Sequence, residues 1–141
     1  MIRLMGVAPT LLFSEVGMAN VQEQAPRWLA GLFGVVGSLH FVVPDFMAQT
    51  VPSWVPAKKT VIYVSGVAEV ACAVGLVRRE RWAGPVSAAC LLAIWPANIQ
   101  MALDAGSGKN PGPADNRAIM WARVPMQLPM IWAALQSKPR T

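Results

Sequence analysis

Charged side chains are scarce in this chain of 141 residues. Asp, Glu, Lys and Arg together make up 13% of the sequence, whereas hydrophobic residues make up 55%. Soluble domains typically carry about 25% charged residues, and a water-soluble fold of this composition would expose wide apolar patches. The composition therefore argues against a soluble protein and favours a lipid bilayer as the partner. The length leaves room for one domain.

Residues that build redox and metal sites are also few. The two cysteines, Cys72 and Cys90, form no C-x-x-C motif, which excludes a thioredoxin-like dithiol. The single histidine, His40, cannot supply a haem ligand pair or a multi-histidine metal site, so we expect no metal. No phosphate-binding glycine loop or nucleophile elbow is present. We expect both cysteines to be small residues at helix contacts, with a redox pair as the alternative.

Four apolar runs separate the clustered charges, and their lengths approach the roughly 20 residues that a membrane-spanning helix needs. They lack the strict alternation of a membrane β-barrel. We therefore expect an all-α integral membrane four-helix bundle, with a transmembrane domain over residues 27–137. A soluble all-α bundle is the alternative. The expected helices cover about residues 27–43, 59–77, 82–103 and 117–136.

Residues 1–26 precede the first run and have a different character. Their apolar stretch, Leu4–Phe13, is too short to span a membrane and contains Pro9. No small-x-small cleavage site follows it before Glu15. We expect a loosely ordered cytoplasmic tail. Whether translation starts at Met1 or at Met18 stays open, and neither start changes the expected bundle.

Lysine and arginine predict the orientation of the bundle. Seven of these residues fall on one side of the expected membrane and five on the other, and three of the seven crowd one short loop. The positive-inside rule then places both termini in the cytoplasm. No basic helix face or aromatic–basic platform is present, so we expect no nucleic-acid partner. The cytoplasmic set is Arg3, Arg27, Arg78, Arg79, Arg81, Lys138 and Arg140, and the outer set is Lys58, Lys59, Lys109, Arg117 and Arg123.

Polar side chains recur inside the apolar runs at similar depth. Ser65 and Glu69 are four residues apart and share a helix face, as do Arg123 and Gln127. Polar groups in lipid are costly and usually face the bundle interior. We therefore predict one pocket in the outer half of the bundle, with Glu69 and Arg123 as direct or water-bridged neighbours. The expected ligand-binding residues are His40, Ser65, Glu69, Asn98, Arg123 and Gln127.

Five short motifs carry a family resemblance. They are G-S-L-H-F at Gly37–Phe41, V-P-S-W-V-P at Val51–Pro56, Y-V-S-G-V-A-E at Tyr63–Glu69, W-P-A-N-I-Q-M-A at Trp95–Ala102 and R-V-P-M-Q at Arg123–Gln127. In this order and spacing the chain resembles the DoxX-like family of small four-helix membrane proteins, from about Trp28 to Leu135. The family's polar positions map onto the same six pocket residues. The resemblance implies a multi-pass protein of a bacterial inner (plasma) membrane.

The resemblance also implies a function. Members of that family are associated with thiosulfate:quinone oxidoreductase and with membrane complexes that handle oxidative or thiol stress. We thus expect a membrane subunit of a redox or oxidative-stress system, with a pocket for a quinone or another lipophilic ligand. A soluble or membrane oxidoreductase subunit would be its partner, and catalysis by the chain itself stays open.

Two other functions are alternatives. The first is a non-catalytic membrane scaffold or assembly factor whose polar core only fixes helix packing. The second is a small carrier, which four short helices would form only as a homo-oligomer.

Overall fold

The computed structural model describes residues 8–139, with side chains from residue 15 onward. Over these residues the chain contains five α-helices, one 3-10 turn and no strand, which confirms the all-α class. The elements are α1 (Ala8–Val42), α2 (Pro44–Gln49), α3 (Lys58–Arg78), α4 (Ala83–Asp104), the 3-10 turn η1 (Gly112–Asp115) and α5 (Arg117–Leu135).

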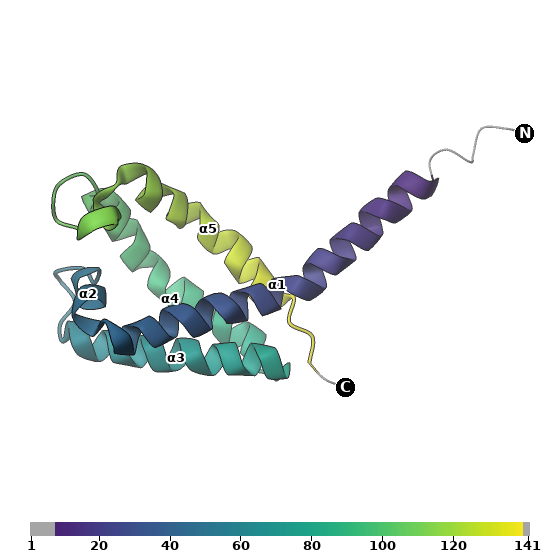
Figure 1. Cartoon of the computed structure of the whole chain (residues 1–141), viewed down its shortest axis with the longest axis horizontal. Coiled ribbons are helices and arrows are strands. Elements are labelled where there is room, and N and C mark those ends of the chain that lie inside the picture. The colour runs from purple at the N-terminus through teal and green to yellow at the C-terminus, as the bar shows by residue number, and fades with distance from the viewer. Residues whose placement is uncertain (1–7, 140–141) are drawn as a thin grey trace, which may run out of the picture.

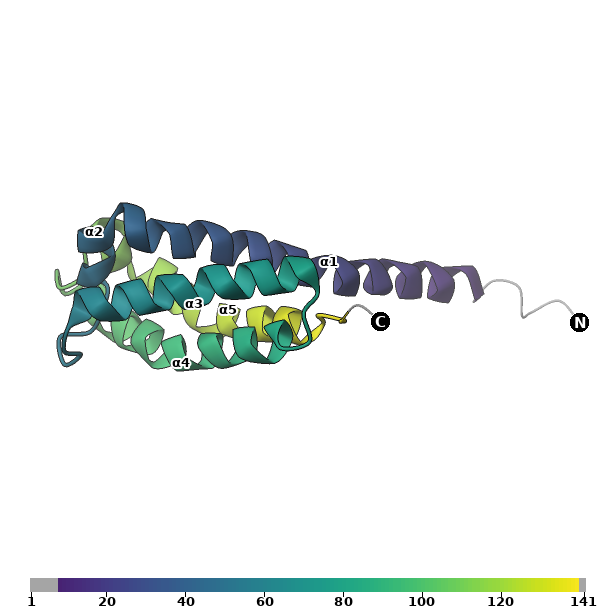
Figure 2. The same ribbon diagram turned by 90° about the horizontal axis from the view of Figure 1, so that it is seen from below.

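The four long helices are arranged as two pairs. α1 packs along α3 and α4 packs along α5, while weaker α3–α4 and α1–α5 contacts join the pairs. In Figure 1 the α4–α5 pair diverges from the α1–α3 pair toward the end that carries α2 and η1. Figure 2 shows the four helices running side by side along the long axis, with the α3–α4 turn at the opposite end.

Helix α1 differs most from the expectation. It is 35 residues long, so residues 8–26, expected to be loosely ordered, are helical, while residues 1–7 of that tail lie outside the described residues. Pro9 lies in the first turn, where a missing N–H costs no hydrogen bond, and Gly17 is the only glycine between Ala8 and Pro26. The N-terminal half of α1 extends beyond the rest of the bundle (Figures 1 and 2). Its cytoplasmic location stays a prediction.

The other long helices begin and end within about one residue of their expected positions, because proline, glycine and charge delimit them. The first loop differs, since it contains the short helix α2. Pro44 is its first residue, a position where proline is well tolerated. Asp45 pairs with Lys59 at 2.6 Å and so links α2 to the start of α3.

Alanines and other apolar side chains fill the interior toward the α3–α4 turn, and this core includes Phe33, Cys72, Leu91 and Ala134. Large apolar side chains instead cover the outside of the bundle. By length and composition, α3 and α4 are the helices among residues 8–139 that could cross a membrane, which is weak evidence for membrane association. Four spans were expected.

Candidate functional site

Two glycines bring α1 and α3 together where His40 and Glu69 lie. A Cβ atom on Gly37 would lie 3.0 Å from Cβ of Glu69, and one on Gly66 would lie 2.8 Å from Cβ of His40. Since these positions hold only hydrogen, the two backbones approach closely. The close approach buries both polar side chains, each of which is 5% exposed.

Glu69 keeps one unused oxygen in this contact. Its Oε1 accepts a hydrogen bond from the Ser65 hydroxyl at 3.0 Å. Its Oε2 lies 3.8 Å from Nδ1 of His40 and has no hydrogen-bond partner among residues 8–139. Nδ1 of His40 lies 2.7 Å from the carbonyl oxygen of Val36, and because a carbonyl can only accept, Nδ1 carries hydrogen and donates it there.

Gln127 of α5 is the most fully buried polar side chain near this carboxylate. It is 0% exposed, and neither its Nε2 nor its Oε1 has a hydrogen-bond partner in the described part of the chain. An unpaired buried polar group costs about 1–3 kcal/mol. Gln127 therefore offers a bound molecule one donor group and one acceptor, beside the free oxygen of Glu69.

A cavity of about 230 Å³ lies between the two helix pairs and is lined by α1, α3, α4 and α5. Four of the six predicted site residues line it, and Ser65 and His40 lie beside it next to Glu69. The rest of the lining is apolar. The polar lining residues are Glu69, Asn98, Arg123 and Gln127, and the apolar ones are Leu32, Phe33, Val36, Leu91, Ile94, Met126 and Met130.

The predicted direct contact between Glu69 and Arg123 is not formed within residues 8–139. Nη2 of Arg123 instead donates to Oδ1 of Asn98 at 3.3 Å, and Nη1 lies 3.9 Å from Sδ of Met120. The pairing of the helices explains the difference, since α5 packs on α4, which carries Asn98, whereas α3 packs on α1. The two charged residues thus line one cavity from different helix pairs, and a water bridge between them stays a prediction.

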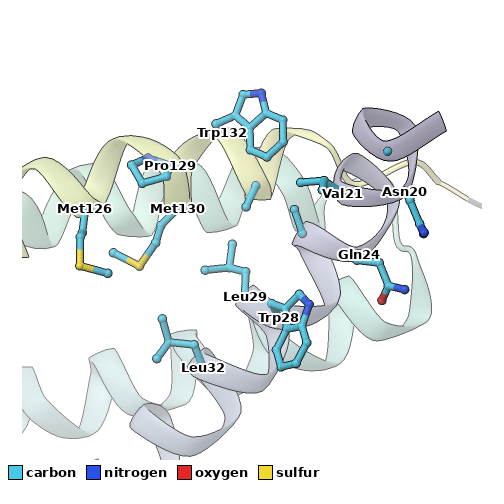
Figure 3. A pocket seen from close by; sticks show the side chains of 13 residues that line it. Asn20, Val21, Gln24, Trp28, Leu29, Leu32, Met126, Pro129, Met130 and Trp132 are labelled. Atoms are coloured by element: carbon cyan, nitrogen blue, oxygen red, sulfur yellow. The ribbon is translucent and has the colours of Figure 1, made fainter. Parts of the chain in front are cut away.

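A wider apolar groove of about 720 Å³ adjoins this cavity between α1 and α5. Figure 3 shows Leu29 and Leu32 of α1 facing Met126 and Met130 of α5 across it. Leu32, Met126 and Met130 also line the inner cavity. The groove therefore gives an apolar route from the outside of the bundle to the polar groups.

A third hollow, of about 390 Å³, lies on the other side of Glu69 between α3 and α4. Glu69, Ser65 and Cys90 line it together with apolar side chains. Cys72 is buried beside it, and its Sγ lies 4.0 Å from Sγ of Cys90. The cysteines thus lie at a helix contact, and they also face each other. No cluster of three metal-ligating side chains occurs over residues 8–139.

Two polar residues of the interior were not predicted. Ser87 is 0% exposed, and its Oγ has no hydrogen-bond partner in the described range. Trp95 donates from Nε1 to the carbonyl oxygen of Val124 at 3.1 Å and so ties α4 to α5. Both lie in the apolar run over residues 82–103, where any side chain with a hydrogen-bonding atom is a candidate.

Residues 29–138 match a family described as a domain of unknown function, DUF8561. The chain belongs to this family. The match covers more than half of the chain and includes all six predicted site residues. Comparisons with curated proteins and with solved structures found no match.

The predicted resemblance to the DoxX-like family is therefore wrong, because the family found is DUF8561. Each of the five motifs is short, and V-P-S-W-V-P and Y-V-S-G-V-A-E consist largely of Gly, Ala, Val, Trp and Pro, which are common in membrane helices and their connections. Their order therefore discriminates poorly between families of membrane proteins. The redox role inferred from the resemblance loses that basis, and the residues of the cavity must carry any functional argument.

Proposed function

We propose that this protein crosses a lipid bilayer four times and binds a lipophilic molecule with a polar head in the cavity beside Glu69 and Gln127. The proposal has two parts. The first is the membrane location of all four long helices, and the second is the ligand.

The distribution of charge supports the membrane location. Over residues 15–139, Glu69 and Arg123 are the charged residues between two charged ends of the bundle. At 1.5 Å per residue, the segments between these ends span roughly 22–32 Å in the four long helices, near the ~30 Å hydrocarbon core of a bilayer. One end holds Glu23, Arg27, Arg78, Arg79, Glu80, Arg81 and Lys138, and the other holds Asp45, Lys58, Lys59, Asp104, Lys109, Asp115 and Arg117.

The outer surface between these ends supports the same conclusion. Each long helix exposes large apolar side chains there: Val35 on α1, Val67 on α3, Leu92 on α4 and Leu128 on α5. Contiguous apolar surface of this kind is rare on soluble monomers. Contact with lipid would remove this apolar surface from water on all four helices. This includes α1 and α5, whose polar residues and prolines make them less apolar than α3 and α4.

Gln127 is the observation that carries the ligand proposal. The described side chains leave its donor and acceptor unpaired, each worth about 1–3 kcal/mol, and a polar head in the cavity could pair with both. A quinone is the class that we place first. Its carbonyl oxygens can accept from Gln127 and Arg123, and the hydroxyls of its reduced form can donate to Gln127 and to the free oxygen of Glu69.

The shape of the adjoining hollows suits such a molecule. The inner cavity of about 230 Å³ has room for a compact head, and the groove of about 720 Å³ continues it with an apolar lining that would suit an alkyl tail. In the proposed membrane location the molecule would enter from the hydrocarbon between α1 and α5, at the part of the groove lined by Leu29, Leu32, Met126 and Met130, because the lining residues before Arg27 lie beyond the charged end.

A non-catalytic scaffold is the second candidate, and the close glycine contacts favour it. A Cβ atom on Gly84 of α4 would lie 2.7 Å from the carbonyl oxygen of Ala134 on α5, and Gly37 and Gly66 bring α1 and α3 equally close. Small residues of this kind fix helix packing in membranes. A scaffold would use these contacts without a ligand in the cavity.

Mass spectrometry of the full chain, purified gently in lipid nanodiscs, separates the two candidates. Organic extraction should release one lipophilic molecule bearing carbonyl or hydroxyl groups in near-equal molar amount to the chain. A scaffold would instead retain partner proteins and release only bulk phospholipid. After reconstitution in lipids that contain quinone, recovery of no more quinone than from protein-free nanodiscs of the same lipids would refute the ligand proposal.

A further inference from the structure

Cys72 and Cys90 are in direct contact between α3 and α4. Cys72 of α3 is 1% exposed, and its Sγ lies 4.0 Å from Sγ of Cys90 on α4. A disulfide needs a sulfur–sulfur distance of about 2.05 Å. Rotating one cysteine side chain between staggered rotamers moves its sulfur by roughly 3 Å, which is more than the missing distance. The two thiols therefore lie within reach of a direct bond.

The hollow beside these thiols is suited to a lipophilic reactant. Cys90 lines the hollow of about 390 Å³ between α3 and α4, together with the apolar side chains of Val61, Val64 and Ile94. Val61 and Val64 are exposed on the outside of the bundle, so the hollow opens on the surface that we propose faces lipid. A reactant dissolved in the bilayer could reach Cys90 without crossing water.

A proton acceptor lies on the same wall. Glu69 lines the hollow with Cys90 and precedes Cys72 by three residues, which puts both on one face of α3. Its Oε2 has no hydrogen-bond partner among residues 8–139 and lies 3.8 Å from Nδ1 of His40. Because the thiolate is the reactive form of cysteine, a neighbouring base is the group that such a thiol needs.

We propose that Cys72 and Cys90 form a redox-active dithiol that a membrane quinone oxidises to a disulfide, with Glu69 taking the first thiol proton. This inference rests on the proposed membrane location and ligand class, but it concerns the hollow between α3 and α4 rather than the cavity at Gln127. It assigns a chemical activity to the two cysteines, which the binding proposal does not use, while Glu69 lines both hollows and takes part in both proposals.

The reaction balances as follows. Glu69 takes the proton of the Cys90 thiol, and the thiolate adds to a ring carbon of the quinone. The sulfur of Cys72 then attacks the sulfur of Cys90, the sulfur–sulfur bond forms, and the carbon–sulfur bond breaks with its electron pair passing to the ring. The ring takes the two thiol protons and leaves as quinol. The dithiol is thus oxidised by two electrons and the quinone is reduced by two.

Anaerobic titration of the reduced full chain in nanodiscs with decylubiquinone tests the proposal. Wild type should form one quinol per chain. After denaturation neither cysteine should react with an alkylating reagent, and the mass of the chain should fall by that of two hydrogens. Cys72→Ala and Cys90→Ala should form no quinol. Glu69→Gln should react roughly 10²-fold more slowly, the usual contribution of a positioned base. Ferricyanide, which stays in water, should oxidise wild type far more slowly than the quinone does.

The outcomes separate this inference from the binding proposal. Gln127→Leu should lower quinone binding in the inner cavity, whereas Gln136→Leu, which lines neither hollow, should leave both binding and thiol oxidation unchanged. Saturable quinone binding with both thiols retained would overturn the dithiol proposal and leave the binding proposal standing. A stable mass increase by one quinone, without quinol, would also overturn it, since it shows arylation of a cysteine. Absence of both binding and oxidation would overturn both proposals.

Discussion

Gly66 of α3 lies directly against His40 of α1. A Cβ atom on Gly66 would lie 2.8 Å from Cβ of His40 and 2.9 Å from the ring of Phe41. This contact sets the distance between the two helices at the level of Glu69. It therefore determines how deeply the carboxylate is buried and how the wall of the inner cavity is formed.

Gly66→Ala should destabilise the bundle, because its methyl group has no room between α3 and α1. Overpacking of this kind costs about 1–3 kcal/mol. Gly31→Ala is the matched control, since nothing lies within 4 Å of a Cβ atom there, and alanine favours the helix. Unfolding in mixed detergent should show a loss for the first variant and no loss for the second. Equal stability of the two variants would contradict the close α1–α3 contact.

The membrane orientation predicts which loops react from outside the cell. In a Cys72→Ala, Cys90→Ala background, Lys109→Cys in the loop before α5 should react with a membrane-impermeant thiol reagent in intact cells. Lys138→Cys, near the C-terminus, should react only after the cells are opened. The opposite pattern would reverse the orientation, and labelling of both in intact cells would contradict a bundle of four spans with both termini inside.

Arg123 should be coupled in stability to Asn98 rather than to Glu69. Its guanidinium donates to Asn98 at 3.3 Å, whereas Glu69 bonds to Ser65 within its own helix. A double-mutant cycle of Asn98→Ala and Arg123→Gln should show a coupling energy of at least about 0.5 kcal/mol. The cycle of Glu69→Gln and Arg123→Gln should be additive within about that amount. Stronger coupling in the second cycle would restore the predicted direct pair.

The sequence predicted some elements well for identifiable reasons. The limits of α3, α4 and α5 follow from charges, prolines and glycines at their ends. Helix α1 was underestimated, because residues 8–26 are too polar to span a membrane but contain little that prevents a helix. The short helix α2 was missed, since prolines in a loop mark both turns and helix starts.

The candidate site was predictable in composition but not in contacts. The spacing of Ser65 and Glu69, or of Arg123 and Gln127, gives the shared face of one helix. It does not say which helix that face meets. The pairing of α1 with α3 and of α4 with α5 decides that Glu69 lies beside His40 and that Arg123 lies beside Asn98. The same lack of pairing information left the Cys72–Cys90 contact as an alternative rather than a prediction.

Binding of decylubiquinone to the full chain in nanodiscs tests the central claim most directly, when wild type is compared with Gln127→Leu and Gln136→Leu. Gln127 lies within α5, whereas Gln136 follows α5 and does not line the inner cavity. The side chain of Gln136 bonds only to the carbonyl oxygen of Trp132 among the described residues. We predict saturable binding to wild type, unchanged affinity for Gln136→Leu, and affinity roughly 10- to 100-fold lower for Gln127→Leu, as expected for a buried hydrogen-bonding group. Equal affinity of the two variants, or no saturable binding to wild type, would contradict the account.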